Sequence, residues 1–225
     1  MKRTSNFPYK NYVFDCDGVI LDSNHIKTDA MKILVEPYGK QVTEEYINFH
    51  RQNAGLPRLK KFIHLFENIL NIKDSSSYKV DLEKLMENFQ KITIEKLKSS
   101  NEIIGVRKYI EKLPIESKKF IVSGAPQEDL EIILNYKNLT PFFNEICGSP
   151  KTKKENFNFL KSKYDLSNSI FFGDSMIDYN MAMEFNMDFV FIYGKSDFDN
   201  WQDFFISNKN AHSTSVKISK DFTSN

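Results

Sequence analysis

The sequence has few cysteines, no long apolar run and no excess of either charge. Only two cysteines, Cys16 and Cys147, occur in 225 residues, which argues against a disulfide-stabilised scaffold. No apolar run approaches the ~18 residues of a membrane-spanning helix, and no apolar segment follows the first basic residues as in a secretory signal. With 31 basic and 30 acidic side chains, nothing indicates nucleic acid or an anionic membrane as partner. We therefore expect a cytoplasmic protein.

The start and the second half of the chain read as strands alternating with helices. Buried apolar runs predict strands over residues 12–15, 118–124, 142–148, 169–175 and 188–194. Helical patterns fill the segments between the later runs, and this alternation predicts a parallel sheet with helices on both faces. In the polar tail, Val216, Ile218 and Phe222 could add a last edge strand.

Residues 24–98 have a different character. Apolar residues recur there at helical spacing, and the segments 37–39 and 74–77 break the pattern into several helices. The first strand lies before this region and the other strands lie after it. We therefore predict an α/β core formed by residues 1–23 and 99–225, interrupted by an inserted helical domain.

Polar residues stand at the ends of four predicted strands. In parallel sheets, ligands bind outside the carboxyl ends of the strands. The fifth strand ends in Tyr193-Gly194 and offers nothing polar. The other four ends carry Asp15 and Asp17, then Ser123 and Gly124, then Lys151, Lys153 and Lys154, then Asp174 and Asp178.

The clustered carboxylates indicate phosphoryl chemistry. They repel one another unless a cation neutralises them, and Mg²⁺ takes a few carboxylate oxygens together with water and substrate phosphate. Asp15 and Asp174 could share one such ion. A carboxylate can also attack phosphorus to form an aspartyl-phosphate, and a second carboxylate can then serve as acid and base. Asp17 suits that second role, because a tight turn at Gly18 could fold it back over the site.

The ordered motifs resemble those of the haloacid dehalogenase-like (HAD) hydrolases. "DCDGVILDS" is similar to their first motif, "VSG" to the second, a downstream lysine to the third and "GDSMID" to the fourth. The resemblance runs from about residue 12 to 193. It implies a Rossmann-like parallel-sheet core, with an α-helical cap domain inserted after the first strand.

The resemblance also implies roles for single residues. Asp15 would be the nucleophile and a Mg²⁺ ligand, and Asp17 the acid and base, with its backbone carbonyl also on the metal. Ser123 and the N–H of Gly124 would hold phosphate oxygens, although Ser123 could instead cap a helix. Asp174 would bind Mg²⁺ directly. For Asp178, direct ligation and a supporting position behind the ligands both stay open.

The third motif departs from the common "KPxPD" pattern. Aligning "KTKKE" to that pattern selects Lys151, whereas "GSPKTKKEN" resembles a shorter variant whose active lysine is Lys153. We favour Lys153, with Lys151 and Lys154 as alternatives.

The segment "HRQNAGLPR" is a glycine-containing break between two cap helices. It could reach over the core and contact substrate through Arg51 or Arg58, and solvated surface arginines are the alternative. His25 lies near the start of the cap and could also face substrate.

These features predict a Mg²⁺-dependent phosphatase that hydrolyses a small phosphate ester, such as a sugar phosphate or phosphoglycolate, through an aspartyl-phosphate. A phosphomutase of the β-phosphoglucomutase type is the first alternative. A non-catalytic binding module with the same fold is an alternative of another class. A dehalogenase is disfavoured, because those relatives do not need the aspartate that Asp17 supplies. The oligomeric state stays open between a monomer and a weak homodimer.

Overall fold

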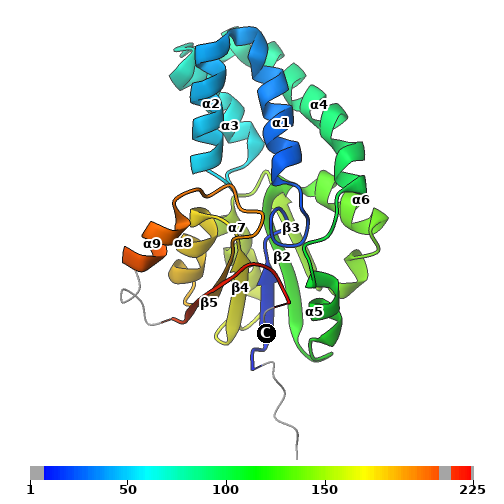
Figure 1. Ribbon diagram of the computed structural model, residues 1–225. Coiled ribbons are helices and arrows are strands. Elements are labelled where there is room, and N and C mark those ends of the chain that lie inside the picture. Colours follow the sequence, from blue (N-terminus) through cyan, green and yellow to red (C-terminus); the bar gives the residue numbers. More distant parts are fainter. Residues whose placement is uncertain (1–7, 208–213, 224–225) are drawn as a thin grey trace, which may run out of the picture.

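The computed structural model describes residues 8–207 and 214–223, so the first seven residues of the predicted core lie outside the described chain. A six-stranded parallel sheet forms the centre (Figure 1), in the order β3-β2-β1-β4-β5-β6. The expected edge strand is confirmed at Val216 and Ile218, because β6 pairs in parallel with β5, whereas Phe222 follows the strand and packs into a hydrophobic core. The strands are β1 (Asn11–Phe14), β2 (Lys118–Pro126), β3 (Glu145–Ser149), β4 (Ser169–Gly173), β5 (Asp188–Ile192) and β6 (Val216–Ser219).

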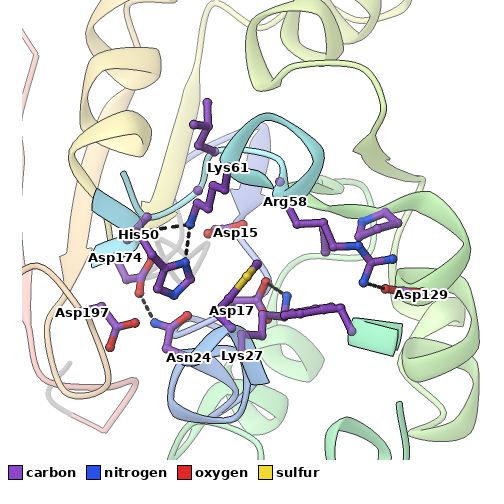
Figure 2. A pocket seen from close by; sticks show the side chains of 18 residues that line it. Asp15, Asp17, Asn24, Lys27, His50, Arg58, Lys61, Asp129, Asp174 and Asp197 are labelled. Atoms are coloured by element: carbon purple, nitrogen blue, oxygen red, sulfur yellow. Dashed lines mark hydrogen bonds and ion pairs between the residues drawn. The ribbon is translucent and has the colours of Figure 1, made fainter. Parts of the chain in front are cut away.

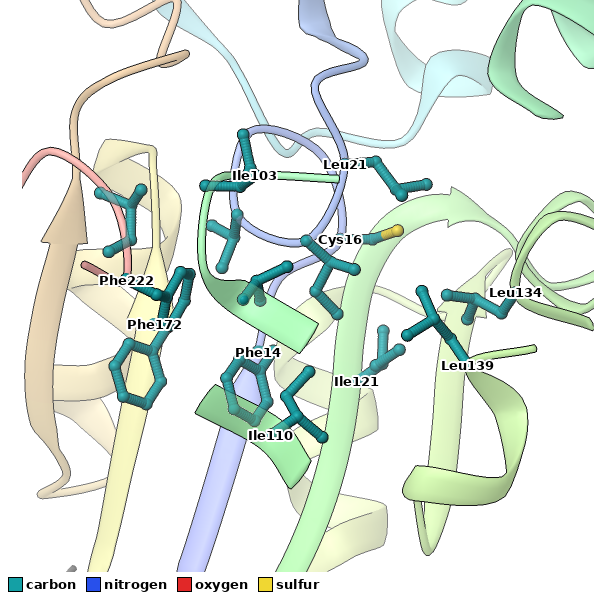
Figure 3. Packing of buried hydrophobic residues seen from close by; sticks show 14 of the residues in the cluster. Phe14, Cys16, Leu21, Ile103, Ile110, Ile121, Leu134, Leu139, Phe172 and Phe222 are labelled. Carbon is teal, nitrogen blue, oxygen red and sulfur yellow. The ribbon is translucent and has the colours of Figure 1, made fainter. Parts of the chain in front are cut away.

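Helices cover both faces of this sheet, as the alternating pattern predicts. Side chains of β1 alternate between two hydrophobic cores: Tyr12 and Phe14 pack into one, and Val13 packs into the other. In the first core (Figure 3), the rings of Phe14 and Phe172 stack with centroids 4.9 Å apart. The helices of this part are α5 (Val106–Lys112), α6 (Gln127–Tyr136), a 3₁₀ turn (Thr140–Phe142), α7 (Lys153–Lys163), α8 (Met176–Glu184) and α9 (Trp201–Ser207).

Residues 24–99 form a block of helices, and the sequence predicts an inserted helical domain over residues 24–98. The expected breaks are confirmed: Gly39 precedes the second helix, and Asp74 caps the last one by accepting from the Ser76 N–H. A third hydrophobic core holds the block together, including the stacked rings of Tyr46 and Phe62. The block contains α1 (Asn24–Val35), a 3₁₀ turn (Glu36–Tyr38), α2 (Lys40–Gln52), α3 (Arg58–His64), a π-helical turn (Leu65–Ile69) and α4 (Ser75–Ser99).

The helical block lies over the carboxyl ends of the strands (Figure 1). Its two connections to the sheet run side by side: Leu21 forms an antiparallel bridge with Glu102, and the Asp22 N–H donates to the Asn101 carbonyl over 2.9 Å. None of the helices in the described part of the chain has the length and apolarity required to cross a bilayer. The fold thus leaves a space between block and sheet where the polar strand ends meet.

Candidate active site

Asp15 lies where β1 ends, in the middle of the sheet. Its N–H donates to the Phe172 carbonyl of β4 over 2.9 Å, which fixes the backbone at the strand end. The residue is only 3% exposed. Burial raises the pKa of Asp15 to about 7, since the charge of Lys153 offsets only part of the desolvation and Asp178 adds repulsion. Oδ1 of Asp15 has no hydrogen-bond partner within the described chain, so this oxygen is available to a ligand.

Lys153 is the lysine that reaches Asp15. It begins α7, and its Nζ lies 3.1 Å from Asp15 Oδ2 and 2.5 Å from Asp178 Oδ1. Burial alone would lower the pKa of Lys153, but the two carboxylates raise it above its ordinary value. The neighbouring lysines point elsewhere: Lys151 lies over the Phe159 ring, and Lys154 pairs with Glu184 on the surface.

Asp174 completes an acidic cluster with Asp15 and Asp178. One carboxylate oxygen from each of the three lies within 4.8 Å of the others. Burial, followed by repulsion from Asp15 and Asp178, raises the pKa of Asp174 well above its ordinary value. A hard divalent cation would bind the unpartnered oxygen of Asp15 and remove the repulsion among the three carboxylates. The donor set therefore fits Mg²⁺.

Asp178 is engaged on both carboxylate oxygens. Oδ1 accepts from Lys153, and Oδ2 accepts from the Ser175 hydroxyl over 2.6 Å within a capping box at the start of α8. Asp15 and Asp174 therefore have more free ligand capacity than Asp178. Through its Oδ1, Asp178 holds the ammonium group of Lys153 in position beside Asp15.

Asp17 lies on the turn after Asp15, held by Ser23 and by Lys27 of the first block helix. Its Oδ1 accepts from the Ser23 hydroxyl over 2.6 Å, and its Oδ2 pairs with the ammonium group of Lys27. Burial favours a raised pKa, but the Lys27 charge and these hydrogen bonds outweigh it and lower the pKa of Asp17. The turn requires glycine at position 18, because a Cβ there would lie 2.1 Å from Asp174 Oδ2.

The loop between α2 and α3 closes the site from above. Gly55 has a φ of +83°, and a Cβ at this position would lie 3.3 Å from Lys153 Nζ. The Gly55 carbonyl approaches so closely that a Cβ on Gly124 would lie 2.2 Å from its oxygen. Block and sheet surround a cavity of about 60 Å³, and Asp15, Asp17 and Asp174 are among the residues that line it (Figure 2).

Residues 12–192 match the profile of the haloacid dehalogenase-like hydrolase family. The chain belongs to this family. A curated relative, a phosphorylated carbohydrates phosphatase of Thermotoga maritima, is 30% identical over 147 residues, which is 63% of this chain and 62% of that protein. The chain therefore aligns with less than two thirds of that relative's length.

Solved structures share the fold of this HAD protein. β-Phosphoglucomutase from Clostridium difficile superposes with a TM-score of 0.72 at 17% identity, over 96% of this chain and 93% of that one. YfnB from Bacillus subtilis, whose crystal structure bound to magnesium reveals interdomain movement, gives a TM-score of 0.61 at 18% identity over 95% of each chain.

The two arginines of the α2–α3 segment lie in different places in the HAD protein. The Arg58 guanidinium lines the cavity, with Nη1 3.0 Å from Asp129 Oδ2 of α6 and its centre 4.9 Å from the Phe89 ring centroid. Arg51 is exposed and does not line the cavity. Arg58 thus joins the helical block to the core, whereas Arg51 faces solvent.

The remaining predicted residues also differ in position. Gly124 lines the cavity, while Ser123 is fully buried and its hydroxyl oxygen accepts from the Ala125 N–H over 3.1 Å. His25 is exposed and lies 3.3 Å from Asp22, away from the cavity lining.

The expectation that β5 ends without polar groups at the site is wrong. The Ser196 hydroxyl donates to the Asp174 carbonyl over 2.5 Å, and Asp197 lines the cavity. Ser196 and Asp197 lie four and five residues beyond the end of β5 at Ile192, so the residues Tyr193-Gly194 next to the strand gave no sign of this contribution.

Sequence reasoning also missed cavity residues of the helical block. Asn24 donates to Asp174 Oδ2 over 2.6 Å, and Lys27, His50 and Lys61 line the cavity. A signal existed for His50, which shares the buried face of α2 with Thr43 and Tyr46 at helical spacing. A polar group on an apolar helix face indicates a specific partner.

Proposed function

We propose that this protein is a Mg²⁺-dependent phosphatase that hydrolyses a small phosphorylated metabolite through an aspartyl-phosphate on Asp15. The observation that carries the proposal is the free Oδ1 of Asp15, buried at the strand end, with Lys153 beside the other oxygen of the same carboxylate. Family membership and the curated phosphatase relative support the same chemistry.

In the first step, the Asp15 carboxylate attacks the phosphorus and the bond to the leaving alcohol breaks. Lys153 offsets the negative charge that gathers between Asp15 and the transferring group, and Asp178 keeps the ammonium group in place. A Mg²⁺ ion held by Asp15 and Asp174 would supply further stabilisation of the phosphoryl charge.

Asp17 moves the protons in both steps. Lys27 and the hydrogen bonds lower the pKa of Asp17, so the carboxylate must take up a proton before the first step. As the acid it gives that proton to the leaving oxygen. The resulting carboxylate takes a proton from the water that attacks the phosphorus, which breaks the bond to Asp15 and releases phosphate. Ser23 and Lys27 hold its two oxygens in position at the cavity. Lys27 lies on the first helix of the helical block and Ser23 directly precedes that helix, so placement of the acid and base depends on the position of the block.

The enclosed cavity indicates that the block must open for substrate to enter. Its volume of about 60 Å³ is far below the ~300–1,000 Å³ of typical small-molecule sites. The paired connections at Leu21 and Glu102 lie next to the motif that carries Asp15, which suits a hinge. The interdomain movement in YfnB supports such an opening.

The test is hydrolysis of p-nitrophenyl phosphate with and without Mg²⁺. We expect turnover with Mg²⁺, loss of turnover with excess EDTA, recovery when Mg²⁺ is restored, and no recovery with Ca²⁺, which prefers a looser and higher coordination. Asp81→Asn, on the exposed face of α4, is the matched control for Asp15→Asn. Full activity in EDTA would refute the proposal, and conversion of a sugar phosphate to an isomer without phosphate release would show a mutase.

A further inference from the structure

Lys61 is a buried cation at the cavity that the proposed chemistry does not use. Its residue is 4% exposed and lies on α3, and its side chain lines the cavity with Asp15 and Asp174 (Figure 2). Its Nζ lies 3.0 Å from His50 Nδ1 and 3.3 Å from the His50 carbonyl oxygen. Both partners are neutral acceptors, so two of the three ammonium N–H groups are accounted for and one remains.

A chain of hydrogen bonds fixes the position of this ammonium group. The Thr28 hydroxyl donates to Asp197 Oδ2 over 3.1 Å, so its single proton is used. The contact of 3.0 Å between Thr28 Oγ1 and His50 Nε2 must then have the histidine as donor, which leaves Nδ1 as acceptor for Lys61. Hydrogen-bond donation therefore runs in one direction, from the cavity to the loop after β5: Lys61 donates to His50, His50 to Thr28, and Thr28 to Asp197.

Lys61 differs from the other cations around the cavity by its lack of a carboxylate partner. Lys27 pairs with Asp17, Arg58 with Asp129, and Lys153 with Asp15 and Asp178. Lys61 forms no ion pair with any residue in the described part of the chain. Burial, followed by the Lys27 charge, lowers the pKa of Lys61 to about 7, although the charges of Asp197, Asp17 and Asp174 partly offset this shift. A buried cation without an anionic partner is costly, and an anion that enters the cavity removes that cost.

We propose that Lys61 binds a second anionic group of the substrate, a carboxylate or a second phosphate, on the side of the cavity facing the helical block. This inference rests on the proposed phosphatase function and narrows it to phosphate monoesters that carry two anionic groups. The small cavity favours a short spacer between the groups. Asp197 attracts the Lys61 charge but forms no ion pair with it in the described part of the chain, and Asp197 Oδ2 accepts from the Thr28 hydroxyl instead.

The test compares esters that differ only in charge at the far end. One pair is 3-phosphoglycerate and glycerol 3-phosphate, and the other is fructose 1,6-bisphosphate and fructose 6-phosphate. For each pair, kcat/KM is measured in the wild type, in Lys61→Met and in Lys60→Met. Lys60 is exposed on the same helix and is the matched control. The readout is the kcat/KM of the doubly anionic ester divided by the kcat/KM of the singly anionic ester of the same pair.

We expect the wild type to favour the doubly anionic ester of at least one pair by about tenfold or more, as a lost charged hydrogen bond predicts. Lys61→Met should reduce that ratio to near one, and Lys60→Met should keep it. If Lys61→Met does not fold, Lys61→Gln keeps a donor toward His50 and takes its place. A wild-type ratio near one in both pairs, or an unchanged ratio in the Lys61 variant, overturns the inference. Absence of turnover with all esters and with p-nitrophenyl phosphate would instead refute the phosphatase function.

Discussion

The side-chain nitrogen of Lys153 lies 3.1 Å from Oδ2 of Asp15, and both side chains are almost fully buried. Asp15 follows β1 and Lys153 follows β3, and β2 lies between these two strands in the sheet. The long lysine side chain therefore spans the end of β2 to reach the carboxylate. This contact identifies the cation that balances the proposed nucleophile.

Replacing Lys153 should therefore abolish most of the activity. We expect Lys153→Met to lower kcat by about 10²–10³-fold or more, the usual effect of removing one preorganised stabilising group. Lys151→Met and Lys154→Met should stay near the wild type, because these side chains lie over Phe159 and beside Glu184. Circular dichroism should accompany the kinetics, since the substitution leaves buried carboxylates unpaired and costs ~3–5 kcal/mol. An inactive Lys151 variant beside an active Lys153 variant would contradict the assignment.

Gly55 and Gly39 form a matched pair for testing the contact between loop and core. Both have positive φ, so an alanine strains the backbone at either position by ~1–2 kcal/mol. Only at Gly55 would the new Cβ press on Ser175 and Lys153, at 3.2 and 3.3 Å, whereas nothing lies within 4 Å at Gly39. We expect Gly55→Ala to lower kcat/KM by about tenfold or more, and Gly39→Ala to affect the melting temperature alone. Equal activity in the two variants would show that close approach of this loop is unnecessary.

Arg58 and Arg51 should behave differently on substitution. Arg58 joins the helical block to Asp129 of the core, and Gln90 donates to the same carboxylate over 2.7 Å. Arg58→Ala should thus weaken closure and lower kcat/KM for every phosphate ester by a similar factor, about tenfold. Arg51→Ala, at an exposed position, should remain within about twofold of the wild type. The measurement is kcat/KM of Arg58→Ala with a large and with a small phosphate ester. A loss of kcat/KM with the large ester alone would mean that Arg58 contacts the substrate and would contradict a role in closure.

The strands and their polar ends could be predicted because each depends on local sequence. A buried run such as residues 12–14 followed by Asp15 specifies a strand, its end and a carboxylate there. Residues such as Lys27, Lys61 and Asp129 could not be placed, since their partners depend on how the helical block sits on the sheet. Spacing on one helix gives its buried face but not the element that this face meets.

The stability of the protein should fall in mild acid because of His50. Burial, with the charges of Lys61, Lys27 and Arg51, lowers the pKa of His50 to about 2. Below its ordinary pKa near 6.5, the unfolded chain binds a proton at His50 that the folded chain does not, so stability falls as the pH drops. Between pH 7 and pH 5 this contributes about 2 kcal/mol. The free energy of unfolding, measured with urea at pH 7 and at pH 5, should therefore change by about 2 kcal/mol less in His50→Gln than in the wild type.

His25→Gln is the control for this measurement, because the His25 ring is exposed and its Nδ1 lies 3.3 Å from Asp22 Oδ1. It should retain the pH dependence of the wild type. The same pH dependence in His50→Gln would mean that the folded protein admits a proton at His50.

The covalent step on Asp15 can be tested by trapping the protein with beryllofluoride and Mg²⁺ and determining the crystal structure. The free Oδ1 and the adjacent Lys153 ammonium predict a beryllium atom bonded to the Asp15 carboxylate, with Asp17 unmodified and close to the fluorides. Asp15→Asn should show no such adduct and no turnover. An adduct on Asp17 or on another residue, or hydrolysis by Asp15→Asn at the wild-type rate, would contradict the proposed mechanism.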